Sequence, residues 1–134
     1  MPERKTVEKA KAALREGKRP TTAAGPFVRE EMEHVRGGQH GARSPQQAIA
    51  IGLSKARRAG VPLPPPAKGK AKERTRRSAQ AAYEVGQKRR KPRAPSRKRA
   101  AAARGALKRE RKSSASRSAL SAQSRRAARR RARR

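Results

Sequence analysis

The side chains that could take part in acid–base or metal chemistry are few and lie close together in the chain. His34 and His40 are the only histidines, and Glu30, Glu31 and Glu33 precede or flank them. Zinc sites use three or four ligands at recurring spacings, and none of the familiar spacings is present here. Cysteine and aspartate are absent, which excludes thiol catalysis, thiolate metal sites and disulfides. We therefore expect no catalytic residue, no metal and no cofactor, and interpret both histidines as surface-turn residues or phosphate contacts.

The glycines of "RGGQHGARS" raise the question of a phosphate-binding loop. A P-loop requires Gly-Lys-Ser/Thr after a strand, and neither the lysine nor a predicted strand is present. The favoured interpretation is the end of a helix followed by a flexible turn. An alternative stays open, in which amides at the start of the next helix, flanked by Arg36, His40 and Arg43, hold one backbone phosphate.

The dominant chemistry of the chain is cationic. Its 134 residues carry 40 Lys and Arg against 9 acidic residues, a formal net charge of +31, so a polyanion is the expected partner. Residues 1–63 hold 13 basic and 6 acidic side chains, net +7, whereas residues 64–134 hold 27 and 3, net +24. Basic side chains release counterions from phosphates whatever the base sequence. Phe27 and Tyr83 are the only aromatic residues, which disfavours stacking on single-stranded bases and favours duplex DNA, with RNA left open.

The predicted nucleic-acid contacts are basic side chains in two parts of the chain. The smaller group lies near the end of a helix predicted at residues 44–60 and comprises Lys55, Arg57 and Arg58. The larger group lies beyond the prolines and comprises Arg74, Arg76, Arg77, Lys88, Arg89, Arg90, Lys91, Arg97, Lys98, Arg99, Lys108, Arg109, Arg125, Arg126, Arg129, Arg130, Arg131, Arg133 and Arg134.

Three helices are predicted to position the smaller group. "PERKTVEKAKAALREG" places apolar residues at helical spacing and ends at Gly17. "GPFVREEMEHVRGG" begins with Pro26 at its first helical position and ends at Gly37-Gly38. The third helix has Ser44 as its N-cap, Gln47 closing a capping box with the amide of the cap residue, and Gly60 as its stop.

The predicted fold is mainly α, with a small three-helix N-terminal domain at residues 1–63 and a Pro-rich linker at residues 64–70. Residues 71–134 form a Lys/Arg/Ala-rich basic tail. The apolar faces of this tail are almost entirely alanine, and its like charges repel. We therefore expect the tail to be largely disordered or transiently helical in isolation.

Residues 5–66 resemble a family of short basic bacterial proteins whose shared domain has no established function. The segments "FVREE", "HGARS" and "QAIAIGLSKARRAG" carry the resemblance. Some members are labelled DNA-binding or plasmid-stabilisation proteins. The resemblance implies a bacterial origin and transfers no catalytic residue. Beyond residue 66, the composition is similar to that of bacterial histone H1-like tails.

These observations predict a non-enzymatic protein that binds double-stranded DNA without sequence specificity and organises or compacts the nucleoid or a plasmid. It would be cytoplasmic and nucleoid-associated, without a small-molecule substrate. No apolar run approaches the ~20 residues of a membrane span, so no membrane partner is expected. Two alternatives stay open. One is an RNA-associated or ribosome-associated basic protein, and the other is a protein-interaction domain, compatible with a homodimer, that its tail tethers to nucleic acid.

Overall fold

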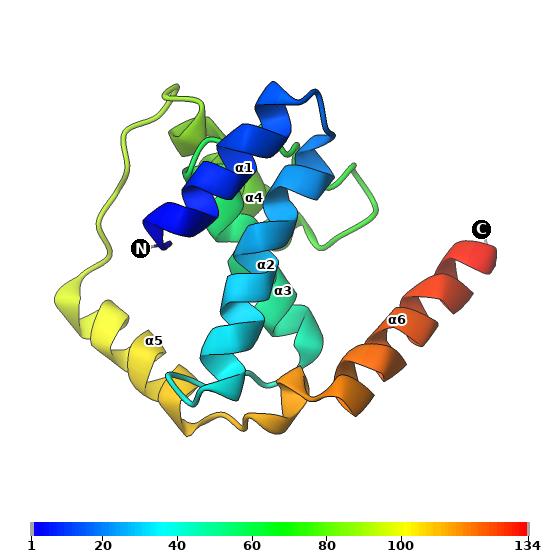
Figure 1. Ribbon diagram of the computed structural model, residues 1–134. Helices are drawn as coiled ribbons and strands as arrows, with labels where there is room; N and C mark the ends of the chain where they lie inside the picture. The colour runs from blue at the N-terminus through cyan, green and yellow to red at the C-terminus, as the bar shows by residue number, and fades with distance from the viewer. Residues whose placement is uncertain (1, 134) are drawn as a thin grey trace. The chain divides into compact units, whose positions relative to one another are not determined.

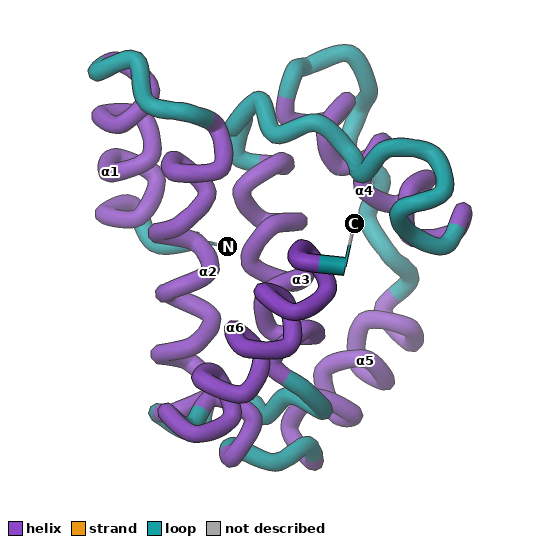
Figure 2. Tube along the Cα trace, turned by 90° about the vertical axis from the view of Figure 1, so that its right-hand side faces the viewer, coloured by secondary structure: helices purple, strands orange, loops and turns teal. Residues whose placement is uncertain are grey.

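The computed structural model describes residues 2–133 and consists of helices joined by loops, with no strand in that range (Figures 1 and 2). The helices follow one another as α1 (Arg4–Arg15), α2 (Pro20–Arg36), α3 (Pro45–Arg58), α4 (Glu73–Gly86), α5 (Arg97–Arg109) and α6 (Arg117–Ala132), with a 3₁₀ turn, η1 (Ser113–Ala115), before α6. Among residues 2–133, no helix combines the length and the apolar character that a membrane span needs.

The chain folds into two compact units that alternate along the sequence. The first unit contains the chain up to Glu30 together with Ile51–Ala94. The second unit contains Glu31–Ala50 together with the chain from Pro95 onward. Helices α2 and α3 therefore contribute residues to both units, and residues 64–70 lie within the first.

The core of the first unit is built from small residues around one aromatic side chain. Phe27 is fully buried, and α2 and α3 lie so close together that a Cβ on Gly52 would be 2.7 Å from the Cα of Val28. Such an approach requires glycine at this position. The other buried members of the core cluster are Ala10, Ala23, Ala24, Ala56, Val61 and Leu63.

The predicted helix ends of α1 and α3 are confirmed, because local signals define them. Gly17 and Gly60 both have positive φ, at 77° and 104°. The amides of the residues after them donate to Ala13 and Ala56, which completes a Schellman motif at each helix end. At the start of α3, the amide of Gln47 donates to the Ser44 hydroxyl as predicted.

The capping box of α3 differs from the prediction in one contact. The Gln47 side chain accepts a hydrogen bond from the Arg43 amide at 2.6 Å, one residue before the cap residue, Ser44. The side chain therefore satisfies a backbone donor that lies just before the helix.

The predicted start of α2 is wrong. The helix begins at Pro20, and Pro26 lies inside it. Both prolines suit the first turn of a helix, where the missing amide costs nothing. Burial decides between them, because Ala23 and Ala24 are 0% and 1% exposed, and a helical conformation packs them into the core.

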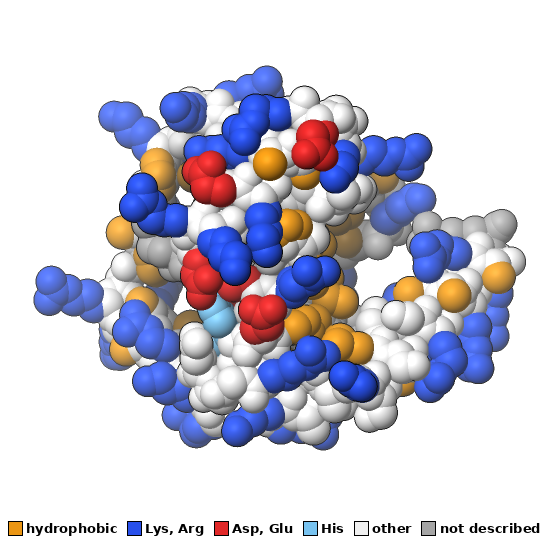
Figure 3. Space-filling view, in the orientation of Figure 1, with side chains coloured by type: hydrophobic (Ala, Val, Ile, Leu, Met, Phe, Trp, Pro, Cys, Tyr) orange, Lys and Arg blue, Asp and Glu red, His pale blue; other side chains and the backbone are white. Residues whose placement is uncertain are grey.

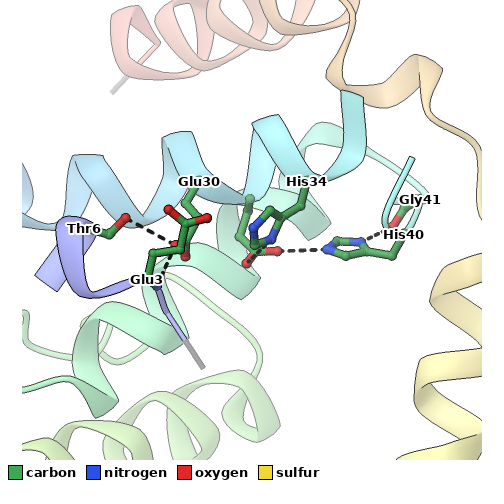
Figure 4. Close-up of polar contacts among 7 residues, drawn as sticks. Glu3, Thr6, Glu30, His34, His40 and Gly41 are labelled. Atoms are coloured by element: carbon green, nitrogen blue, oxygen red, sulfur yellow. Dashed lines mark hydrogen bonds and ion pairs between the residues drawn. The ribbon is translucent and has the colours of Figure 1, made fainter. Parts of the chain in front are cut away.

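The N-terminus of α1 is capped by a side chain from α2. Glu30 is buried, and its Oε1 atom accepts hydrogen bonds from the Glu3 amide at 2.8 Å and from the Thr6 hydroxyl at 3.2 Å (Figure 4). A carboxylate at this position satisfies a free amide and complements the positive end of the helix dipole. Glu30 thus joins α1 to α2 by a polar contact.

The expectation of a largely disordered basic tail after a three-helix domain is wrong, because this part of the chain forms α4, α5 and α6. Two serines cap α5 and α6. Ser96 accepts from the Arg99 amide and Ser116 from the Ala119 amide, each at 3.2 Å. Alanine and arginine have high helix propensity, and basic residues in the last turns of α5 and α6 complement the helix dipoles.

The second unit joins the turn between α2 and α3 to the segment around η1. The Gly41 amide donates to Leu107 at 2.7 Å, and the Ala42 amide donates to Arg111 at 3.0 Å. The Ser114 hydroxyl returns a hydrogen bond to the Ala42 carbonyl at 2.8 Å. A Cβ on Gly41 would overlap the carbonyl group of Glu110, so this approach requires glycine.

Candidate nucleic-acid interface

Arg57, one of the predicted nucleic-acid contacts, is a buried structural residue. It is 8% exposed, its Nε donates to the Leu63 carbonyl at 3.1 Å, and its Nη2 donates to the Pro64 carbonyl at 3.2 Å. Burial lowers the pKa of Arg57 from its ordinary value because desolvation disfavours the charged form. The guanidinium therefore holds the chain after α3 and does not face solvent.

The two neighbouring candidates on α3 lie in different surroundings. Arg58 is exposed, whereas Lys55 is half-buried. Of the three predicted contacts on α3, only Arg58 has a side chain fully open to a ligand.

A second arginine holds the proline-rich segment from α4. The Arg76 Nε donates to the Pro66 carbonyl at 3.1 Å, and its Nη1 lies 2.8 Å from Glu73. Arg77 also lies near Glu73, at 3.9 Å. Proline has a backbone carbonyl but no backbone N–H, so the prolines of this segment supply no amides that could pair with its carbonyls. Arg57 and Arg76 donate hydrogen bonds to these carbonyls instead.

The remaining cations around α4 are exposed, and one of them is paired. Arg90 lies 3.5 Å from Glu84, whereas Arg74, Arg89 and Lys91 are exposed. Lys88 is exposed too and has a φ of 60°, the only positive φ of a non-glycine residue between residues 2 and 133. The basic residues of this region are therefore partly neutralised by glutamates.

The basic residues of α5 gather on one side of the helix. At about 100° per residue, five of the six basic side chains of α5 fall within an arc of about 140°. Arg99 lies outside the arc. Arg104, which was not among the predicted contacts, lies inside it. This cationic face of α5 consists of the exposed residues Arg97, Lys98, Arg104, Lys108 and Arg109.

Helix α6 carries a similar face made of arginine alone. The same spacing places five exposed arginines within an arc of about 140°, and Arg131 on the opposite side. Basic side chains and hydrophobic side chains both reach the surface along this helix (Figure 3). The cationic face of α6 consists of Arg125, Arg126, Arg129, Arg130 and Arg133. Arg134, also predicted as a contact, lies outside the described residues.

The cations of α5 and α6 differ from those of α4 in having no acidic partner among residues 2–133. In the described part of the chain, none of their basic side chains forms an ion pair. Arg125 donates only to the Ser121 hydroxyl, at 3.2 Å. These side chains thus combine exposure with uncompensated positive charge.

The alternative phosphate site before α3 is not assembled in the structure. The Arg36 Nε donates to the Ala115 carbonyl at 2.8 Å. His40 faces Glu31 and Gly41, and the Arg43 amide donates to Gln47. The groups proposed to hold an anion are engaged with the protein's own acceptors.

The structure instead brings both histidines to one buried carboxylate. The Glu31 side chain is 0% exposed, with its Oε2 3.1 Å from the His40 Nε2 and its Oε1 3.6 Å from the His34 Nδ1. The two imidazole rings are 6.1 Å apart and meet edge to face. Figure 4 shows the His34 and His40 rings next to each other, and the dashed line from the outer nitrogen of His40 marks its contact with this carboxylate. Sequence reasoning missed the cluster, although Glu31 and His34 stand three residues apart on a helix that a Gly-Gly turn follows.

Residues 4–68 are similar to a family of unknown function (DUF6496). The match covers α1 to α3 and the proline-rich segment, slightly less than half of the chain. It confirms the expected resemblance to a family without established function, whereas the bacterial origin and the histone-like character of the C-terminal part remain predictions. Comparisons with curated proteins and with solved structures find no match.

Proposed function

We propose that the protein binds duplex DNA without sequence preference, through the cationic faces of α5 and α6. The observation that carries this proposal is the exposure of ten basic side chains on two helical faces, none of which has an acidic partner among residues 2–133. A net charge of about 2–8 is enough to keep a small domain soluble, so solubility alone does not account for the positive charge of these two helices.

Counterion release supplies the affinity in this proposal. The α6 face extends for about 12 Å along the helix axis, and about 12 Å of duplex carries roughly seven phosphates. The five arginines of this face therefore have enough phosphates within reach along an equal length of duplex. Arginine also binds phosphate through two parallel hydrogen bonds, and it remains charged at any physiological pH.

The width of these helices favours duplex DNA over duplex RNA. An α-helix with its side chains is about 10–12 Å wide, close to the roughly 12 Å width of the DNA major groove. The deep, narrow major groove of RNA does not admit side chains in this way. The scarcity of aromatic side chains further supports backbone contacts over base stacking.

The placement of the two faces within one unit supports a role in organising DNA. Helices α5 and α6 extend in different directions from the segment around η1 (Figure 1). One molecule then contacts phosphates on two segments of duplex, which is the property that nucleoid or plasmid compaction requires.

Binding of the full-length protein to labelled nucleic acids tests the proposal. Fluorescence anisotropy with two unrelated duplexes of equal length should give equal affinities. The logarithm of the affinity should fall linearly with the logarithm of salt, with a slope of about −4.5 or steeper for five or more phosphates. A shallow slope or a strong preference for one duplex would contradict the proposal. Tighter binding to an RNA hairpin at the same salt would favour the RNA-associated alternative.

A further inference from the structure

We propose that Glu31, His34 and His40 form a binding site for one divalent transition-metal ion of the zinc class. This site is independent of the cationic faces of α5 and α6, and it departs from the expectation of no metal drawn from spacing alone. Two neutral imidazoles and one carboxylate are ligands that zinc accepts, with a fourth position left for water.

Helix geometry and one turn assemble the three side chains. Glu31 and His34 are three residues apart on α2, which places them on the same face. The helix then ends in a Schellman motif, in which Gly38 has a φ of 77° and the Gln39 amide donates to the His34 carbonyl at 3.0 Å. This reversal brings His40 back over the last turn of α2.

The distances between the donor atoms suit a tetrahedral ion. Bonds of about 2.0–2.1 Å from zinc to nitrogen and oxygen place neighbouring ligand atoms roughly 3.3 Å apart. The carboxylate oxygens of Glu31 lie 3.1 Å from His40 and 3.6 Å from His34. One donor atom from each of the three residues lies within 4.8 Å of the other two. Closing the site around an ion requires the side chains to rotate until these separations approach roughly 3.3 Å.

The hydrogen bond of His40 to the backbone directs its other nitrogen toward the site. The His40 Nδ1 lies 2.8 Å from the Gly41 carbonyl oxygen, which only accepts, so Nδ1 carries the proton. In the neutral imidazole, Nε2 then presents a lone pair to the Glu31 carboxylate 3.1 Å away. This contact requires a positive charge between the two atoms, which either a proton on Nε2 or a bound metal ion supplies. Zinc-binding histidines usually donate the second ring N–H to a carboxylate, a backbone carbonyl or water.

The surroundings hold the turn in place and leave the histidines accessible. The amides of Gly41 and Ala42 are bonded to Leu107 and Arg111, so the position of His40 does not depend on its side-chain contacts alone. The side chains of His34 and His40 are 16% and 18% exposed, and histidine atoms reach the molecular surface (Figure 3). An ion can therefore enter from solvent and meet a buried carboxylate.

Titration of the full-length protein with Zn²⁺ tests the site, with His40→Gln as the variant and Glu33→Gln as the matched control. Glu33 is exposed and lies between Glu31 and His34 in sequence. Calorimetry in 150 mM NaCl should show one ion per chain at micromolar or tighter affinity. His40→Gln should weaken this at least about tenfold, whereas Glu33→Gln should leave it unchanged. Because His40 is partly exposed, circular dichroism of the variant should match that of the native chain.

Two further readouts separate this site from adventitious binding. Since the chain has two histidines, NMR should show both imidazoles shifting together as one equivalent of Zn²⁺ is added. The melting temperature should rise with the Zn²⁺ concentration, and His40→Gln should abolish the rise. The proposal is overturned if the native chain binds Zn²⁺ no better than His40→Gln, if Glu33→Gln weakens binding equally, or if the imidazole signals do not move.

Discussion

Replacing Arg57 by glutamine should lower the free energy of unfolding by about 2–3 kcal/mol, whereas the same change at Arg58 should alter it by less than about 0.5 kcal/mol. The guanidinium of Arg57 donates to the carbonyls of Leu63 and Pro64. Hydrogen bonds from a charged donor contribute about 1.5–3 kcal/mol each. The desolvation that lowers the pKa of Arg57 offsets part of this, and the shorter amide of glutamine recovers little of it.

Urea unfolding followed by circular dichroism measures the difference. Both variants lose one positive charge from adjacent positions on α3, so the comparison cancels the change in net charge. The transition of Arg57→Gln should move to lower urea at an unchanged slope, because the surface exposed on unfolding stays the same. Equal midpoints for the two variants would refute a structural role for Arg57. A larger loss at Arg58 would reverse the assignment of the buried residue.

Three further substitutions test two backbone conformations and one surface ion pair. Gly41→Ala should destabilise the protein by about 2 kcal/mol or more in urea unfolding, since the added Cβ would overlap the Glu110 carbonyl group; an unchanged midpoint would contradict this contact. Lys88→Gly should stabilise the protein by roughly 0.5–1 kcal/mol, because the backbone of Lys88 has a φ of 60°, which is strained for any residue with a Cβ. A loss of stability in this variant would argue against the positive φ at residue 88. Lys18 lowers the pKa of Glu16 through a hydrogen bond and its charge. The stability that this pair adds is present above the ordinary pKa of Glu16 and lost as pH falls through the lowered one. Lys18→Met should therefore raise the pKa of Glu16 in an NMR titration, and an unmoved pKa would show that the pair does not form.

Helix ends set by local chemistry could be predicted from the sequence. Gly17 and Gly60 end α1 and α3 because a left-handed residue after a helix is cheapest for glycine. Ser44 begins α3 because its hydroxyl accepts an amide hydrogen within three residues. Each of these signals involves residues a few positions apart, and no distant contact overrides it.

Features that depend on distant contacts or on competing local terms could not be predicted. The start of α2 depends on the burial of Ala23 and Ala24, which periodicity alone does not reveal. The helices of the C-terminal half were predicted to form only transiently, because repulsion between like charges and weak apolar faces were expected to outweigh helix propensity. The serine caps at Ser96 and Ser116 were the local signal available for them.

The candidate interface was predicted by charge, and charge alone does not distinguish its members. Arg57 and Arg58 are identical side chains at adjacent positions, but helix geometry turns one inward and the other outward. Similarly, the involvement of Glu31 with both histidines depends on the turn after α2, whose path is set by contacts with Leu107 and Arg111. Only the three-dimensional arrangement identifies which basic residues remain exposed and unpaired.

The salt dependence of duplex binding by a variant without the α6 face tests the account most directly. The five arginines Arg125, Arg126, Arg129, Arg130 and Arg133 would be replaced by glutamine in the full-length chain. The matched control carries five glutamines in place of the exposed residues Arg4, Lys9, Lys11, Arg15 and Arg19, so that both variants lose the same charge.

We expect the slope of log affinity against log salt to become shallower by about 4–5 in the α6 variant, since each lost phosphate contact contributes about 0.9. The control should change the slope by less than about 1. Equal slopes in the two variants would show that binding follows total charge and not the face of α6, and would contradict the proposed interface.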